Sequence, residues 1–507
     1  MDLSHWISHW ADWHGARTAV HFEGRDISYG EMDGRVRRLA AMLQRELAVA
    51  KGDRVAYLGY NSPELLELLF ACARLGAMLV PLNWRLAPPE HAWILQNCEP
   101  KAVLAEADFF AHLDGLRPQL PGPRMVSYGP APGAGWQSYE ALLDNASSEA
   151  RGAGGQPDDP VTLVYTAGTT GRPKGTVLTQ EAIFYNALNA IAAQGITGRD
   201  HVLTVLPMFH VGGMNIQTTP AIHAGASVTI QARFDAAATL AAIAQRQPTL
   251  FLTVPAMAIA LTAHPDWPGA DLSSLRLVNT GSSAVPEAVL RAFLDRGVPT
   301  TQVYGMTESA PVAICLAIAD VRSRMGSCGK PALHCRARIV DDSGRPVTLG
   351  SRGEIVLAGK NLFREYWRDE AGTAAAFAGG WFHTGDIGHQ DDEGFFYVDE
   401  RKKDVVISGG ENIYPAELEN ILADCPDLAE AAVVGRPDPR WGEIPVACVV
   451  PQPGSSIQGA DILALFEGRL ARYKHPREVI FMAVLPRNAM GKVEKFTLRE
   501  QLAAAEA

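Results

Sequence analysis

One glycine-rich stretch, residues 165–175 (Tyr-Thr-Ala-Gly-Thr-Thr-Gly-Arg-Pro-Lys-Gly), constrains the fold of this chain more than any other feature. It follows an apolar run at 161–164, which indicates a buried strand. Glycine permits sharply turned backbone, so a loop of this composition can direct several N–H groups into one concavity that suits an anion. A plain polar turn is the alternative, but such a turn needs no close grouping of threonines, glycines and a lysine. The stretch therefore predicts a phosphate-binding loop directly after a strand.

The order of residues in this loop points to a particular family. A P-loop requires Gly-Lys-Ser/Thr at the start of a helix, whereas Lys174 stands between Pro173 and Gly175, and we expect it on a loop. The stretch resembles the phosphate-binding loop of the adenylate-forming enzymes, which include acyl-CoA synthetases, firefly-type luciferases and peptide-synthetase adenylation domains. That loop usually carries a hydroxyl where this chain has Ala167. We expect weaker ATP binding from this change and not loss of activity, because the backbone donors remain.

Length and composition fit a large globular enzyme. A chain of 507 residues predicts two to four domains, and 47% hydrophobic with 20% charged residues is ordinary for a protein that buries a large core. The net charge of −11 argues against a nucleic-acid-binding surface. The cysteines are odd in number and form no Cys-x-x-Cys pair, which predicts a reduced cytoplasmic protein without disulfides or a zinc site. They are Cys72, Cys98, Cys315, Cys328, Cys335, Cys425 and Cys448.

No secretory signal or membrane-spanning segment is expected. Residues 1–15 contain aspartates and histidines where a signal peptide would be apolar, and no apolar run reaches the length that spans a bilayer. Peripheral membrane contact stays open, and the sequence is compatible with a monomer or a homodimer.

The first three hundred residues alternate between apolar runs and helical patterns. Ser28 and Ser62-Pro63 are good helix starts. Residues 129–159 are rich in Gly, Pro, Ala and Ser and predict a surface connection that leads into the phosphate loop. Strand and helix in alternation predict parallel sheets with helices on both faces. We expect strands at 54–60, 77–82, 102–105, 202–206, 227–230, 250–254, 275–278 and 301–304.

The last third of the chain has a different pattern. Short strands separated by Asp-Ser-Gly and Glu-Gly turns over residues 337–398 predict a small β-rich subdomain. A compact α+β unit follows the charged run at 399–404. The expected fold is thus α/β: a large N-terminal domain (1–401) with two parallel-type α/β sheet subdomains and the β-rich subdomain, and a small mobile α+β C-terminal domain (402–507).

Polar residues at two strand ends extend the resemblance. Ligands of open α/β sheets bind at the carboxyl ends of strands, and Mg²⁺ on ATP takes one or two carboxylates. The resemblance implies that Glu308 binds this metal, that Thr307 contacts a phosphate oxygen or the AMP, and that Tyr304 flanks the adenine. The full set of implied nucleotide contacts in this part is Thr166, Gly168, Thr169, Thr170, Gly171, Lys174, Gly281, Ser282, Ser283, Tyr304, Gly305 and Thr307.

Motifs near the C-terminus complete the implied machinery. Asp386, in a Thr-Gly-Asp motif, would accept hydrogen bonds from both ribose hydroxyls, and Arg401 would also reach the ribose. Lys403 stands at the family's pivot position. Lys492 would bridge the substrate carboxylate and ATP in the transition state, although a terminal lysine is otherwise usually solubilising. The resemblance assigns the CoA tunnel to Gly409, Gly410 and Trp441; Arg472, Lys474 and Arg477 would meet CoA phosphates or form a solvated basic patch.

The acid is expected in an uncharged pocket. His210, in a Pro-x-x-His motif, would be a pocket wall and gate for the thiol and not a general base. Residues 211–217 include no acidic side chain to hold an amino acid's ammonium, and Val303 replaces the arginine that binds a second carboxylate in malonate-type synthetases. These features favour an apolar monocarboxylic acid. The implied pocket is His210, Val211, Met214, Val254, Val303, Met306, Ala310 and Pro311.

The sequence as a whole predicts an AMP-forming acyl-CoA synthetase that uses ATP, Mg²⁺ and CoA. Similarity along the chain favours a fatty acid. An aromatic or alicyclic acid is the alternative, as is a stand-alone adenylating enzyme that loads a carrier protein. A nucleotide-binding regulatory protein with a decayed site is the rival from another class, and Ala167 is its only support.

Overall fold

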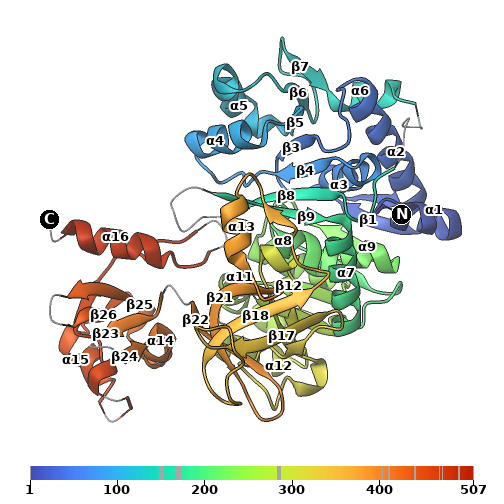
Figure 1. Cartoon of the computed structure of the whole chain (residues 1–507). Helices are drawn as coiled ribbons and strands as arrows, with labels where there is room; N and C mark the ends of the chain where they lie inside the picture. Colours follow the sequence, from blue (N-terminus) through green and yellow to red (C-terminus); the bar gives the residue numbers. More distant parts are fainter. Residues whose placement is uncertain are drawn as a thin grey trace. The chain divides into compact units, whose positions relative to one another are not determined.

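The computed structural model describes residues 2–147, 154–166, 173–281, 287–401, 404–408, 411–438, 441–467, 469–470, 472–488 and 491–505 (Figure 1). The chain divides into two compact units. The first comprises Met1–Ala337 with Leu357–Phe382, and the second comprises Arg338–Val356 with His383–Ala507. Each unit is described separately below. The predicted boundary near residue 402 stays a prediction.

The first unit holds an eight-stranded sheet in the order β19-β9-β8-β4-β3-β5-β6-β7. Strands β4, β3, β5, β6 and β7 are parallel, and β8 joins β4 in parallel, as the alternating pattern predicts. Its strands are β3 Arg54–Leu58, β4 Met78–Pro81, β5 Ala102–Ala105, β6 Arg124–Ser127, β7 Trp136–Ser138, β8 Pro160–Thr166, β9 Lys174–Thr179 and β19 Glu365–Tyr366. The helices that accompany it are α2 Tyr29–Arg45, α3 Pro63–Leu75, α4 Pro88–Cys98, α5 Phe110–Leu116 and α6 Tyr139–Asn145.

A second sheet of the first unit has nine strands in the order β16-β15-β14-β13-β12-β10-β11-β1-β2. The run from β1 to β14 is parallel, and the remaining edge strands are antiparallel. Its strands are β1 Thr18–Phe22, β2 Arg25–Ser28, β10 His201–Thr204, β11 Ser227–Ile230, β12 Leu250–Thr253, β13 Leu277–Gly281, β14 Thr300–Tyr304, β15 Ile314–Cys315 and β16 Lys330–Pro331. The unit's other helices are α1 His5–His14, α7 Gln180–Gln194, α8 Val211–Gly213, η3 Met214–Thr218, α9 Thr219–Ala224, α10 Ala236–Arg246, α11 Pro255–Thr262, α12 Glu287–Leu294 and α13 Glu370–Ala376.

Local sequence explains where the helices begin. The Ser28 and Ser62 hydroxyls accept hydrogen bonds from backbone N–H groups in the first turns of α2 and α3, so both predicted helix starts are confirmed. Gly76 ends α3 in the left-handed conformation, with φ 71°. One face of the eight-stranded sheet packs a core against α4 and α5, including Val80, Leu95 and Leu113.

The structure adds detail to one expectation about this unit and contradicts another. Residues 129–159, predicted as a surface connection, contain β7 and α6, because Trp136 packs on Phe110 at 4.5 Å between ring centroids and buried Tyr139 donates to Glu67. Lys174 begins strand β9 instead of lying on a loop, because β9 pairs antiparallel with β8. The composition of a segment does not reveal a pairing partner elsewhere in the chain.

The remaining strands form two smaller sheets. The third sheet has the order β17-β18-β21-β20 with β22 beside β21, and the division between the units passes through its strands. They are β17 Cys335–Val340, β18 Gly353–Gly359, β20 Phe377–Ala378, β21 Trp381–Gln390 and β22 Phe396–Arg401. The fourth sheet, in the second unit, has the order β24-β23-β26-β25 with β27 beside β26. Its elements are β23 Val406–Ser408, β24 Glu411–Ile413, β25 Leu428–Asp438, β26 Gly442–Pro451, β27 Glu478–Phe481, α14 Pro415–Ala423, α15 Gly459–Ala464 and α16 Lys495–Ala505.

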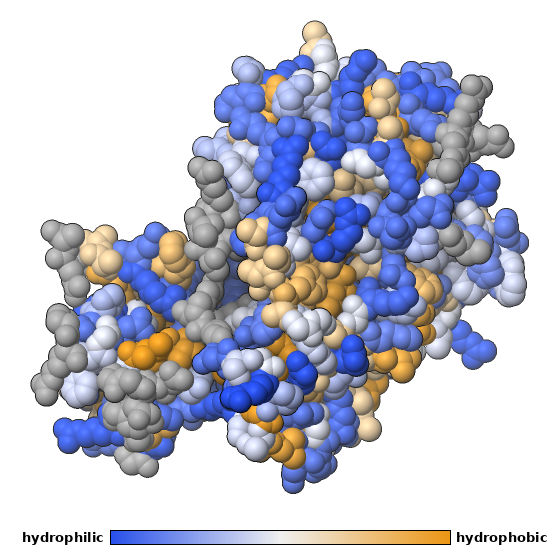
Figure 2. All heavy atoms as spheres, viewed as in Figure 1, coloured by the Kyte–Doolittle hydropathy of each residue, from blue (hydrophilic) through white to orange (hydrophobic). Residues whose placement is uncertain are grey.

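Apolar side chains are mostly buried, and the face in Figure 2 is largely covered by hydrophilic residues. Large apolar side chains that are exposed, such as Trp13, Leu333 and Val484, are scattered along the sequence. Within the described part of the chain, no helix combines the length and apolarity that crossing a membrane demands.

Candidate active site

The β8–β9 hairpin brings both ends of the predicted phosphate loop together. Thr166 and Lys174 are register partners in this antiparallel pair, and the Thr166 hydroxyl donates to the Lys174 carbonyl at 3.5 Å. This pairing brings the Thr166 hydroxyl close to the backbone of Lys174. The loop itself lies outside the described residues, and with it Ala167, Gly168, Thr169, Thr170 and Gly171.

The Lys174 ammonium is oriented by two side chains from a distant segment. Its Nζ lies 3.5 Å from Asp369 Oδ2 and 4.9 Å from the centroid of the Tyr366 ring. Strand β19 pairs antiparallel with β9, placing Tyr366 opposite Thr176. Lys174 and Asp369 are each about one-third exposed, so their ion pair is weak and an incoming phosphate can replace it.

Tyr366 also contacts the predicted metal ligand. Its hydroxyl donates to Glu308 Oε1 at 2.8 Å, and the Glu308 carbonyl accepts from Phe363 N at 2.7 Å. One tyrosine therefore joins Lys174 to Glu308, which are far apart in the sequence. Sequence reasoning missed Tyr366, because an aromatic pair at 366–367 is indistinguishable from ordinary core residues without knowledge of its pairing to β9.

Glu308 fits a magnesium ion that arrives with a nucleotide. Tyr366 engages one carboxylate oxygen, and the second oxygen is a suitable Mg²⁺ ligand. Among the described residues, no group of three or more His, Cys, Asp or Glu side chains could hold a metal by themselves. A metal at Glu308 would therefore need oxygens from phosphate and water, which is the coordination that Mg²⁺ prefers.

The turn after β14 requires glycine at one position. A Cβ on Gly305 would lie 1.6 Å from the Pro311 carbonyl oxygen, so no larger residue fits there. The Ser309 hydroxyl accepts from Met306 N at 3.0 Å and closes the short helix η5 (Thr307–Ser309). This tight turn sets the positions of Thr307, which is buried, and of Glu308, which is half-buried.

The predicted adenine and acyl residues follow four neighbouring strands, β10, β12, β13 and β14. Gly281 ends β13 beside Val303 in β14, and Tyr304 ends β14. Val254 comes directly after β12. Because parallel strands share one carboxyl edge, these residues gather there as the sequence predicts. Ser282 and Ser283 lie outside the described residues.

His210, predicted as a wall of the acyl pocket, caps the start of α8. Its Nδ1 accepts a hydrogen bond from Gly212 N at 3.0 Å, which leaves Nε2 to carry the proton. Burial lowers the pKa of His210 to about 4, so the ring is uncharged at neutral pH. The other predicted pocket residues are mostly buried and uncharged: Val211, Met214, Val254, Val303, Ala310 and Pro311 are buried, and Met306 is half-buried.

The predicted ribose residues meet in the second unit. Asp386 of β21 is the register partner of Arg401 in β22, and Asp386 is buried. Glu354 supports this turn, since its Oε1 accepts from Gly385 N at 3.0 Å. Gly385 has φ +70°, a conformation that favours glycine. Glu354 is a positioning residue that the sequence motif alone did not identify.

Lys492 lies on a tight turn in the same unit. Asn488 N donates to the Lys492 carbonyl at 2.8 Å, and Lys492 N donates to Asn488 Oδ1 at 3.0 Å. The Lys492 side chain is exposed. These two hydrogen bonds fix the backbone at Lys492.

The predicted CoA residues have mixed outcomes. Arg477 lies over the Trp441 ring at 5.6 Å from its centroid, so these two are brought together. Lys474 pairs with Glu417 at 2.6 Å, which favours a structural role over a phosphate contact. Lys403, Gly409 and Gly410 lie outside the described residues.

Comparisons with known proteins agree with this geometry. Residues 7–367 match the model of the AMP-binding enzyme family, and residues 417–492 match its C-terminal domain. An indoleacetate–CoA ligase from Aromatoleum aromaticum is 50% identical over 99% of this chain and 98% of its own length. A feruloyl-CoA synthase from Amycolatopsis is 40% identical, covering 96% of each chain. The structure of Bacillus subtilis o-succinylbenzoate CoA synthetase with ATP and magnesium superposes with a TM-score of 0.86 at 31% identity, over 98% of this chain and 99% of that one.

Proposed function

The chain belongs to the AMP-binding enzyme family of adenylate-forming enzymes, and from that premise we propose that it is an aromatic acid–CoA ligase, with indole-3-acetate as the first acid to test. It is an AMP-forming acid–thiol ligase that uses ATP, Mg²⁺ and CoA. The observation that carries the choice of acid is the 50% identity, over almost the whole chain, to a protein named an indoleacetate–CoA ligase. The fatty acid that the sequence pattern favours is not confirmed, and the aromatic alternative has the better support.

The first half-reaction joins the acid to the α-phosphorus of ATP. A carboxylate oxygen of the acid attacks that phosphorus, the bond to the bridging oxygen breaks, and pyrophosphate leaves. Lys174 and the loop before it hold phosphate oxygens, while Glu308 binds Mg²⁺, which supplies positive charge for the phosphates. Lys492 bridges the acid's carboxylate and the phosphate in the transition state.

The second half-reaction transfers the acyl group to CoA. The thiolate sulfur attacks the carbonyl carbon of the acyl-AMP. The bond between this carbon and the oxygen that bridges it to phosphorus then breaks, and AMP leaves with that oxygen. His210, neutral and held by Gly212, lines the route of the thiol. Rotation of residues 402–507 about Lys403 replaces Lys492 by the CoA-tunnel residues, because one protein face cannot serve both steps.

A cytoplasmic location is part of the proposal. All seven cysteines are free thiols, and most are buried, which is typical of proteins from a reducing compartment.

An acid panel with ATP, Mg²⁺ and CoA tests the proposal. We expect mass spectrometry to detect the thioesters of indole-3-acetate, phenylacetate or ferulate, together with AMP, at lower acid concentrations than for hexanoate, decanoate or palmitate. A clear preference for the straight-chain acids would contradict the aromatic assignment. Adenylate formation that ignores free CoA would indicate an enzyme that loads a carrier protein.

A further inference from the structure

The helix that follows His210 is interrupted by a π-helical turn. Residues Val211–Gly213 are α-helical, Met214–Thr218 form the π turn η3, and α9 continues the helix from Thr219. A π turn inserts an extra residue into the helical repeat and changes the direction of its side chains, and such turns are frequent at functional sites. This turn begins at Met214, one of the predicted acyl-pocket residues.

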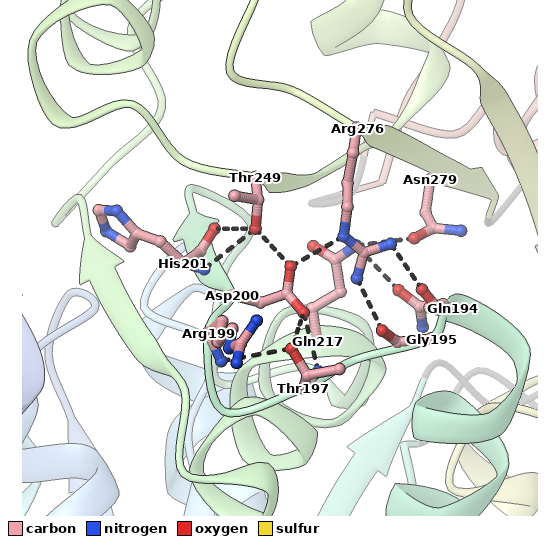
Figure 3. Close-up of polar contacts among 10 residues, drawn as sticks. All are labelled: Gln194, Gly195, Thr197, Arg199, Asp200, His201, Gln217, Thr249, Arg276 and Asn279. Atoms are coloured by element: carbon pink, nitrogen blue, oxygen red, sulfur yellow. Dashed lines mark hydrogen bonds and ion pairs between the residues drawn. The ribbon is translucent and has the colours of Figure 1, made fainter.

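Gln217, on the π turn, is held in one orientation by a buried polar network (Figure 3). Its Nε2 donates to Gln194 Oε1 at 3.0 Å and to Asn279 Oδ1 at 2.7 Å. The amide nitrogens of both partners already donate elsewhere, Gln194 to the Ile216 carbonyl and Asn279 to the Thr301 hydroxyl. The Gln217 oxygen therefore cannot take the place of its nitrogen without facing two other oxygens.

An ion pair beside this network keeps it rigid. Figure 3 shows Arg276 close to Gln194, which is the last residue of α7. Arg276 donates to the Gln194 carbonyl at 2.9 Å and, through Nε, to Asp200 at 2.8 Å. Burial alone would raise the pKa of Asp200, but hydrogen bonds from Arg276 and Thr249 hold it below its usual value, so Asp200 stays ionised.

The Gln217 side-chain oxygen is buried and has no hydrogen-bond partner among the residues that the structure describes. The whole residue is only 1% exposed. Leaving a buried acceptor unpaired is unfavourable, and native proteins rarely do so without a reason. The rigid network explains why the oxygen is presented, and a donor on a bound ligand would explain why it is unpaired.

Gln217 lines a narrow, mostly apolar cavity next to the His210 turn. The cavity is bordered by the end of β10, by Gly213 and Thr218 on the helix, and by Leu252. It has no room for a water molecule, so water does not satisfy the Gln217 oxygen. The polar groups on its wall are engaged elsewhere, since Thr204 and Thr218 bond each other at 2.7 Å and Thr218 bonds the Gly213 carbonyl. Entry of a flat ring edge requires the side chains of Leu206 and Leu252, which line this cavity, to move aside.

We propose that Gln217 Oε1 accepts a hydrogen bond from a ring N–H of the acid, which makes Gln217 a specificity-determining residue for nitrogen heteroaromatic acids such as indole-3-acetate. This inference rests on the proposed function and deepens it. An indole nitrogen is a donor only, so it matches an acceptor that lacks a donor. Apolar walls with one well-placed polar group are typical of small-molecule sites.

The test compares two acids of the same shape on the wild-type enzyme. Benzofuran-3-acetate has an oxygen where indole-3-acetate has N–H, so its ring would face the Gln217 oxygen with another acceptor. Sites built to hydrogen-bond a substrate group reject analogues that lack it, and we expect kcat/KM to be at least about tenfold higher for the indole acid. A second analogue, 1-methylindole-3-acetate, should be rejected to a similar degree.

Two variants assign the preference to Gln217. Gln217→Met keeps the length of the side chain but removes the acceptor, and its indole-to-benzofuran ratio should fall to about one. Gln194→Met is the matched control: it removes the Gln194–Gln217 hydrogen bond but leaves Gln217 Oε1, and Asn279 Oδ1 still accepts from Gln217 Nε2, so the wild-type ratio should be kept. If Gln217→Met fails to fold, Gln217→Leu is measured in its place.

The outcomes separate this inference from the proposed function. A wild-type ratio near one, or a ratio unchanged in the Gln217 variants, would overturn the role of Gln217 while leaving an aromatic acid–CoA ligase in place. Ligation of straight-chain acids alone would overturn both.

Discussion

Replacing Tyr366 with phenylalanine removes one hydroxyl and should weaken adenylation about ten- to a hundredfold. That hydroxyl donates to Glu308 Oε1 at 2.8 Å, and hydrogen bonds to charged groups contribute about 1.5–3 kcal/mol. At about 1.4 kcal/mol per factor of ten, the loss of this hydrogen bond lowers the adenylation rate about ten- to a hundredfold. The ring remains, so the contact with Lys174 Nζ, 4.9 Å from the ring centroid, is preserved.

Initial rates of pyrophosphate release, measured against MgATP and free Mg²⁺, test this prediction. The apparent affinity for Mg²⁺ should fall in Tyr366→Phe, while thermal stability changes little. Tyr397→Phe is the matched control, because the Tyr397 hydroxyl also donates to a carboxylate, Asp391 at 3.4 Å, in the other unit. Kinetics of Tyr366→Phe equal to those of the wild type would refute the idea that Tyr366 positions Glu308 for the metal.

Three further predictions concern other parts of the account. Lys492→Ala should slow acyl-AMP formation by at least about a hundredfold but spare thioester formation from supplied acyl-AMP, and an equal loss in both half-reactions would contradict its role. Gly305→Ala should destabilise the protein by more than about 4 kcal/mol in urea unfolding, because its Cβ would lie 1.6 Å from the Pro311 oxygen, whereas Gly115→Ala, where the Cβ has open space, should not. Burial lowers the pKa of His210 from 6.5 in the unfolded chain to about 4, so the unfolded state binds the proton first and stability should fall as the pH decreases through this window. Urea unfolding at pH 7 and pH 5 should show a smaller pH effect in His210→Asn than in the wild type.

Local patterns in the sequence predicted those parts of the fold that local physics determines. Apolar runs identified β5 and β11 with their bounds as observed, and the serines at 28 and 62 identified two helix starts, because side-chain capping acts within one turn. The strands that precede Val254 and Glu308, and the strand that ends near Gly281, were predicted, and their shared edge followed from the rules of parallel sheets.

Long-range pairings were beyond such patterns. Strand β19 pairs with β9 although most of the chain between them forms a different sheet. The residues next to Tyr366 in the sequence therefore did not predict its role. The position of Lys174 in a strand was missed because it depends on the pairing of β9 with β8. The identity of the acid could not be predicted either, because uncharged residues such as Val211 and Val303 can line a pocket for an aliphatic acyl chain as readily as for an aromatic ring. Only the structure identifies the Gln217 oxygen, which has no hydrogen-bond partner among the described residues.

The transfer of carboxylate oxygen to AMP tests the central claim most directly. When indole-3-acetate labelled with ¹⁸O in both carboxyl oxygens is incubated with ATP, Mg²⁺ and CoA, one labelled oxygen should appear in AMP and the other should remain in the thioester carbonyl. Pyrophosphate should carry no label. Label in inorganic phosphate together with ADP, or thioester formation without label in AMP, would contradict an acyl-adenylate pathway in this enzyme.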